Sequence, residues 1–103
     1  MIQRVREQLQ VPDMLFVYGY VLPPPVVYAF GAEVRKAQYL VQENSRDSLA
    51  SPGALLINTE DLSHRATDPD TRYPNDHVHF GTNGTFLLGV RMAEKIALRI
   101  NRR

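Results

Sequence analysis

Two short apolar runs constrain the fold of this chain more than any other feature of its sequence. They are residues 14–18, Met-Leu-Phe-Val-Tyr, and residues 54–58, Ala-Leu-Leu-Ile-Asn. Neither run alternates polar with apolar residues, which is typical of strands covered on both faces in a parallel sheet. Parallel strands need a long crossover, usually a helix. The stretch from Val26 to about Asn44 has helical spacing of its apolar residues, so the sequence predicts a β-α-β unit.

Helical patterns flank this unit on both sides. Ile2, Val5 and Leu9 recur at helical spacing before Pro12, which predicts a short surface helix at the start of the chain. Between the first strand and the second helix, Leu22-Pro23-Pro24-Pro25 predicts an extended loop. A last helix is expected from about Gly84 to Ile100, with one apolar face made of Phe86, Gly89, Val90, Ala93, Ile96, Ala97 and Ile100. Arg91, Lys95, Arg99 and Arg102 fall on its opposite face. The predicted class is α/β, in the order α-β-α-β-loop-α, with two parallel strands and flanking helices.

Composition excludes several functions. The 103 residues suffice for one small domain, and the absence of cysteine excludes disulfides, thiolate metal sites and cysteine nucleophiles. No apolar run approaches the roughly 20 residues of a membrane span, and the first residues lack a secretory signal, so a cytoplasmic protein without membrane contact is expected. The net charge of +1 does not indicate that the chain binds nucleic acid. The basic row that ends in Arg102 and Arg103 is more often a solvated helix face than a nucleic-acid site.

The candidate catalytic residues lie between the second strand and the last helix. A loop rich in turn formers, residues 63–75, precedes Asp76 and His79. Loops of this length in small domains are usually functional, and open α/β sheets place their sites beyond the carboxyl ends of the strands. An aspartate and a histidine three residues apart can hold and orient a general base.

Three segments support a resemblance to a known family. Residues 55–62, Leu-Leu-Ile-Asn-Thr-Glu-Asp-Leu, are followed by Asp76-His77-Val78-His79-Phe80 and by residues 88–93, Leu-Gly-Val-Arg-Met-Ala. Together they resemble the C-terminal half of the SGNH hydrolases, in particular the sialate O-acetylesterase-like carbohydrate esterases with the pattern D-x-V-H-F … L-G-x-R-M-A. Residues 12–17 and 34–38 resemble the preceding strand and helix of that family. The resemblance implies that residues 1–103 form one half-domain of a flavodoxin-like fold.

The resemblance also implies roles for individual residues. Asp76 would be the acid and His79 the base of a catalytic triad that removes acetyl groups from a carbohydrate, without a cofactor. The family's nucleophile lies in a Gly-Asp-Ser or Gly-Gln-Ser motif, which this sequence does not contain. Ser45, Ser48, Ser51 and Ser63 lack a glycine-rich elbow and are expected to be turn and cap residues. The sequence therefore predicts a partial or relic serine esterase that is inactive alone.

Two alternatives remain open. One is an oligomeric binding module without catalysis, and the other is a metal site formed by His64, Asp76, His77 and His79. The first alternative follows from an unpaired edge of the predicted sheet. If residues 14–18 and 54–58 are the last two strands of a five-stranded sheet, the strand 14–18 presents an unpaired edge. A homo-oligomer paired through that edge, or an additional N-terminal segment that covers it, is then expected.

Overall fold

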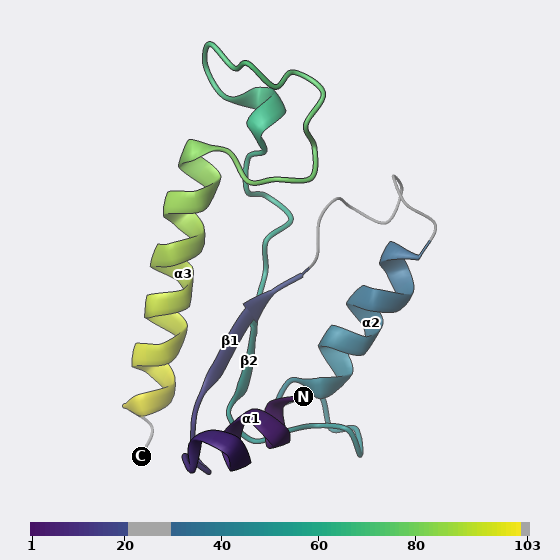
Figure 1. The fold of residues 1–103 in the computed structure, drawn as a ribbon, viewed down its shortest axis with the longest axis vertical. Coiled ribbons are helices and arrows are strands. Elements are labelled where there is room, and N and C mark those ends of the chain that lie inside the picture. The colour runs from purple at the N-terminus through teal and green to yellow at the C-terminus, as the bar shows by residue number, and fades with distance from the viewer. Residues whose placement is uncertain (21–29, 102–103) are drawn as a thin grey trace.

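The computed structural model describes residues 1–20 and 30–101 and shows a small α/β fold (Figure 1). The elements are α1 (Ile2–Leu9), β1 (Phe16–Gly19), α2 (Gly31–Val41), β2 (Ala54–Ile57), a 3-10 helix η1 (Arg65–Thr67) and α3 (Thr82–Ile100). The predicted order is confirmed, and η1 is an addition within the predicted loop. The proline run, the first residues of the predicted second helix, Arg102 and Arg103 lie outside the described residues.

The two strands form a parallel sheet, as the apolar runs predicted. Phe16 pairs with Ala54, and Gly19 pairs with Ile57. The sheet lies between α3 on one side and α2 on the other, with α1 across the end where the strands begin (Figure 1). The prediction that both strands are covered on both faces is right for β2, whose side chains are mostly buried, but wrong for β1, which is half-buried throughout. An apolar hollow between α1, β1 and α2 borders Phe16 and Tyr18, so the cover of β1 is incomplete.

The buried core is small and centres on β2. Its apolar members among the described residues are Ala54, Leu55, Ile57 and Leu62. Thr59 is also fully buried, just past the end of β2, and its hydroxyl donates to the carbonyl of Tyr20 at 3.1 Å. A side chain at Gly19 would collide with the methyl group of Thr59. The carboxyl ends of the two strands are therefore packed closely together, which fixes where the following loop begins.

The helix α3 is turned differently from the expectation that its apolar face packs on the sheet and its basic face meets solvent. Its predicted solvated face lies toward the sheet, because Arg91 donates twice to the Asp61 carboxylate at 2.6 Å, and Arg99 donates to Glu43 at 2.9 Å and 3.0 Å. The apolar face is correspondingly exposed, with Phe86 68 % exposed. Leu88 and Met92 lie half-buried on the same side of α3, so apolar packing and these charge-assisted hydrogen bonds together hold this face toward the rest of the fold.

The loop 63–81 projects beyond the carboxyl ends of the strands, at the top of Figure 1, and leads directly into α3. This is the position predicted for a functional loop. Within residues 1–20 and 30–101, no helix combines the length and apolar character needed to span a membrane.

Candidate functional site

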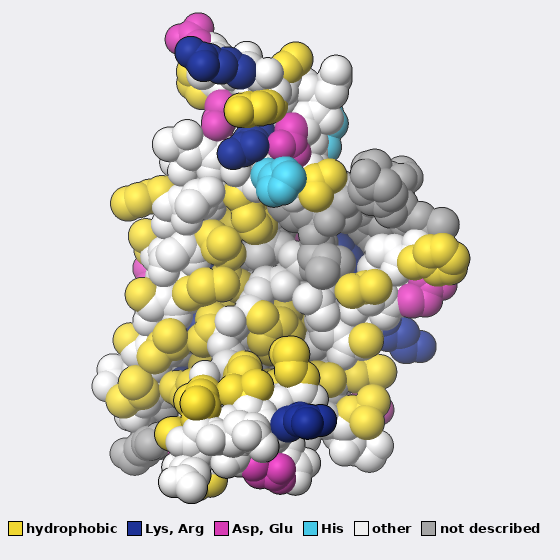
Figure 2. Space-filling view, viewed as in Figure 1, with side chains coloured by type: hydrophobic (Ala, Val, Ile, Leu, Met, Phe, Trp, Pro, Cys, Tyr) yellow, Lys and Arg dark blue, Asp and Glu magenta, His cyan; other side chains and the backbone are white. Residues whose placement is uncertain are grey.

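The loop 63–81 folds back on itself through backbone hydrogen bonds. His64 and Phe80 form an antiparallel bridge. Next to it, Arg65 N–H donates to the His79 carbonyl at 3.0 Å, and Gly81 N–H donates to the Ser63 carbonyl at 2.9 Å. These bonds join the two ends of the loop. Its tip is therefore a closed, hydrogen-bonded lobe, on which acidic, basic and histidine side chains gather (Figure 2).

A carboxylate that sequence reasoning missed attaches the lobe to α3. Asp68 accepts the N–H of Thr82, the first residue of α3, at 3.1 Å and 3.0 Å through its two oxygens. An anion at a helix N-terminus satisfies a free N–H group and is favoured by the helix dipole. The contact spans fourteen residues, so the local capping pattern in the sequence did not reveal it. Two aspartates before the helix, Asp68 and Asp70, were the available signal.

Two glycines allow the lobe to lie against the helix. A side chain at Gly81 would collide with the carboxylate of Asp68 and the carbonyl of His64. A side chain at Gly84, inside the first turn of α3, would collide with the carbonyl of Ser63. Both positions need glycine because of close approach rather than unusual dihedral angles. The resulting contact holds residues 76–79 at a fixed place above the start of α3.

The structure brings Asp76 and His79 together as the sequence predicted. His79 Nδ1 lies 2.9 Å from Asp76 Oδ2 and 3.2 Å from Asp76 Oδ1. Asp76 Oδ1 also accepts the backbone N–H groups of Val78 and His79, each at 3.0 Å. The Asp76 side chain is only 18 % exposed, whereas that of His79 is 67 % exposed. One carboxylate thus fixes both the backbone turn and the imidazole ring.

The hydrogen bonds to Asp76 favour its charged form. The backbone N–H of His79, followed by the backbone N–H of Val78 and the His79 ring, lowers the pKa of the Asp76 carboxyl to about 2. Arg65 adds a longer contact, with Nη1 at 3.8 Å from Asp76 Oδ2, while its guanidinium lies 4.5 Å from the centre of the Tyr73 ring. The aspartate is therefore ionised at neutral pH and can accept a hydrogen bond from the ring.

This arrangement can perform one half of nucleophilic catalysis. With its hydrogen on Nδ1, donated to Asp76, the His79 ring presents an unprotonated Nε2 that can accept a proton from a hydroxyl group. Of the serines considered as nucleophiles, Ser45 has a structural role. Ser45 accepts the N–H of Asp47 at 3.2 Å and donates to the Leu40 carbonyl at 2.7 Å, as expected of a cap. The hydroxyl of Ser63 is buried without a hydrogen-bond partner among the described residues, so the expected cap role is wrong for Ser63.

The other two histidines lie near one another on the lobe. The rings of His64 and His77 meet edge to face, with their centres 6.1 Å apart. Among residues 1–20 and 30–101, no three His, Cys, Asp or Glu side chains are grouped as metal ligands would be. The suggested metal site at His64, Asp76, His77 and His79 therefore receives no support from the geometry.

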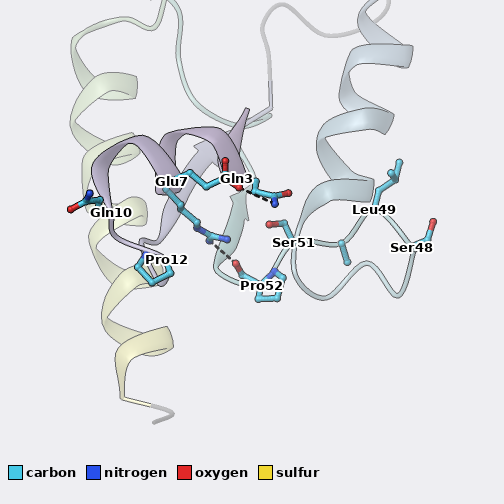
Figure 3. Close-up of a pocket in the computed structure, with 10 residues that line it drawn as sticks. Gln3, Glu7, Gln10, Pro12, Ser48, Leu49, Ser51 and Pro52 are labelled. Atoms are coloured by element: carbon cyan, nitrogen blue, oxygen red, sulfur yellow. Dashed lines mark hydrogen bonds between the residues drawn. The ribbon is translucent and has the colours of Figure 1, made fainter.

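Two larger hollows lie away from the Asp76–His79 pair. One, of about 870 Å³, lies between α1 and the loop 48–52 at the end of the molecule where the strands begin (Figure 3). Arg6 closes part of it by donating to the carbonyls of Met14 and Pro52, at 2.8 Å and 2.6 Å. The other, of about 680 Å³, lies beside α2 and is lined in part by Tyr20, Arg35 and Glu60. Neither hollow contains Asp76 or His79.

Comparison of the chain with protein-family models, with curated proteins and with solved structures gave no match.

Proposed function

We propose that this chain supplies the acid–base pair of a serine-type carbohydrate O-acetylesterase, in which His79 is the base and Asp76 orients it. The observation that carries the proposal is the contact of His79 Nδ1 with the Asp76 carboxylate at 2.9 Å, on a loop beyond the carboxyl ends of parallel strands. An ionised aspartate on Nδ1 selects the tautomer that leaves Nε2 free. The resemblance of residues 55–62, 76–80 and 88–93 to the C-terminal half of the SGNH esterases adds the substrate class.

The proposed reaction needs a serine from outside the residues of this sequence. His79 would take the proton of that serine as it attacks the acetyl carbonyl, and would return the proton to the sugar hydroxyl that leaves. The high exposure of His79 supports a serine supplied by another segment, because the ring is accessible to a partner surface. The removal of the nucleophile from a triad costs several powers of ten in rate. The chain alone is therefore expected to release no acetate above the background.

A fusion protein tests the proposal. The N-terminal half of a sialate O-acetylesterase-like enzyme, with its Gly-Asp-Ser block, is placed ahead of Met1, and acetate release from O-acetylated sugars is measured. We expect release that is lost in His79→Ala and in the serine variant, and retained in His77→Ala, which alters an exposed neighbour outside the pair. A folded fusion that releases no acetate, or that works equally well without His79, would exclude the proposal.

The second candidate function is an oligomeric interaction module without catalysis. The exposed apolar face of α3 favours it, and the half-buried strand β1 leaves the predicted pairing edge as a further candidate contact. Under this reading, His79→Ala changes neither the assembly nor any ester hydrolysis.

A further inference from the structure

The outward face of α3 carries a regular apolar stripe. Phe86, Val90, Ala93, Ala97 and Ile100, here called the α3 seam, are all exposed. Phe86 is 68 %, Val90 37 % and Ile100 50 % exposed. Their spacing alternates between four and three residues, which is the repeat that lines one side of a coiled coil. Hydrophobic side chains run along α3 in the space-filling view (Figure 2). The periodicity points to another helix as the partner of this face.

The seam is exposed because the other face of α3 packs on the fold, through half-buried Leu88 and Met92 and through polar contacts. Arg91 and Arg99 bind Asp61 and Glu43 of the same chain, so rotation of α3 to bury the seam would break both ion pairs. Single exposed hydrophobic residues are normal on protein surfaces, but a contiguous and periodic set marks an interaction site. The fold thus fixes α3 with its apolar side available to a partner.

We propose that the α3 seam pairs with the α3 seam of a second copy of this chain, with the two helices antiparallel. In this arrangement Phe86 lies opposite Ala97 of the second copy, and Val90 lies opposite Ala93. The two-fold axis repeats each contact. Large residues then face small ones along the seam, which is how well-packed helices interdigitate. Ile100 lies at the end of the contact, against Asn83 of the other helix.

The residues beside the seam fit the same pairing. Ile96 of one helix comes beside Gly89 of the other, where a side chain on the glycine would meet no atom of its own chain within 4 Å. The seam carries no charged residue. Glu94, which flanks it, comes beside Leu87 of the second copy rather than beside another glutamate. Antiparallel helices also place the positive end of each dipole near the negative end of the other.

A parallel pair fits less well. It would place Phe86 against Phe86 and Ala93 against Ala93, so the helices would be held apart at one level and leave a gap at the next. The sizes of the seam residues therefore select the antiparallel dimer.

The size of the contact predicts its strength. Fifteen residues of α3 span about 22 Å, which makes a contact along one helix only, shorter than the interfaces of stable dimers, which bury roughly 800 Å² per partner. The dimer is therefore reversible, and dissociates on dilution. This inference does not depend on the esterase proposal, because it uses no residue of the loop 63–81.

Sedimentation velocity of the full chain over a wide concentration range tests the dimer. We expect a shift from monomer to dimer as concentration rises. Ala93→Glu, which places two glutamates at the centre of the seam, abolishes that shift. Leu98→Glu is the matched control, since Leu98 is 61 % exposed on the same helix but lies off the seam; it leaves the shift unchanged. Circular dichroism verifies that both variants keep their helices. A monomer at every concentration, or a dimer that Ala93→Glu does not weaken, overturns the proposal.

Cysteine cross-linking tests the direction of the helices, and the chain contains no other cysteine. A mixture of Phe86→Cys and Ala97→Cys proteins should form a mixed disulfide, because these positions face one another in the antiparallel pair. Phe86→Cys alone should not cross-link to itself, because its two copies lie about 16 Å apart along the helices, beyond the roughly 7 Å that a disulfide allows. Self-cross-linking of Phe86→Cys without the mixed product contradicts the antiparallel arrangement.

Discussion

His79 Nδ1 lies 2.9 Å from Asp76 Oδ2, and the other oxygen of the same carboxylate accepts the backbone N–H of His79 at 3.0 Å. The ring and the backbone of one residue are therefore fixed by one side chain. This double contact separates two functions of Asp76. The carboxylate builds the turn 76–79, and its charge orients the imidazole. Substitutions that preserve the first function and remove the second can be designed from the geometry.

Asp76→Asn should keep the turn and release the ring. The asparagine oxygen can still accept the N–H groups of Val78 and His79, whereas the neutral amide no longer stabilises a hydrogen on His79 Nδ1. We expect the fold to remain and the His79 ring to lose its preference for the Nδ1–H tautomer, as measured by ¹⁵N chemical shifts of the ring nitrogens. The shifts of the His77 ring serve as the internal control. An unchanged tautomer at His79 would show that Asp76 does not select it.

Acid should loosen the loop 63–81 over a defined range of pH. The pKa of Asp76 is lowered to about 2 in the folded protein, against an ordinary value of about 4. Because the folded value is the lower one, Asp76 contributes its full stabilisation above pH about 4 and loses it as pH falls toward about 2. Asp61, whose hydrogen bonds with Arg91 also lower its pKa to about 2, acts over the same range.

Thermal unfolding measured from about pH 6 to about pH 2 tests this expectation, because that range includes both the ordinary pKa of an aspartate and its lowered pKa in the folded protein. The melting temperature should fall most steeply below pH about 4, and Asp76→Asn should reduce that fall. A melting temperature that is flat across this range, or identical pH profiles for the two proteins, would count against the linkage.

Asp68→Ala should destabilise the junction between the loop and α3. It removes the acceptor of the Thr82 N–H, and the loss of a side-chain cap typically costs about 1 kcal/mol. Asp68→Asn keeps one acceptor oxygen and should lose less. Urea denaturation gives the free energy of unfolding for both variants. Equal stability of Asp68→Ala and the parent chain would show that the contact contributes nothing.

Two glycines in the same helix should respond in opposite directions to alanine. In Gly89→Ala the new methyl group meets no atom within 4 Å. The substitution should raise the free energy of unfolding by about 1 kcal/mol, since alanine favours helices. Gly84→Ala introduces a methyl group against the Ser63 carbonyl and should lower stability despite the same gain in helix propensity. Urea denaturation at low protein concentration measures both. A stabilising Gly84→Ala would show that the loop yields readily at this contact.

Much of the local structure could be predicted from the sequence. The apolar runs 14–18 and 54–58 gave β1 (Phe16–Gly19) and β2 (Ala54–Ile57), and helical spacing gave α1 and α3 within two residues of their observed starts. The position of the loop 63–81 followed from the rule that polar residues after parallel strands meet at one edge of the sheet. The proximity of Asp76 and His79 was also predictable, because the two residues are three apart on a turn.

The roles of Asp68 and of the basic residues of α3 could not be predicted in the same way. Spacing along a helix shows which residues share a face, but it does not show which face meets the sheet. The contacts of Arg91 with Asp61 and of Arg99 with Glu43 join residues 30 and 56 positions apart. Such contacts depend on where the tertiary fold places each carboxylate.

The sequence by itself determined the α/β class, the parallel pairing of two apolar strands and the Asp76–His79 pair, because these depend on residues close together or on a regular period. Only the tertiary structure decided the rotation of α3, the attachment of the loop through Asp68 and the exposure of the α3 seam. The physical reason is that contacts between residues far apart in the sequence, namely the packing of Leu88 and Met92 and the ion pairs of Arg91 and Arg99, hold α3 by the face opposite the seam. Its apolar face was thereby left for a partner.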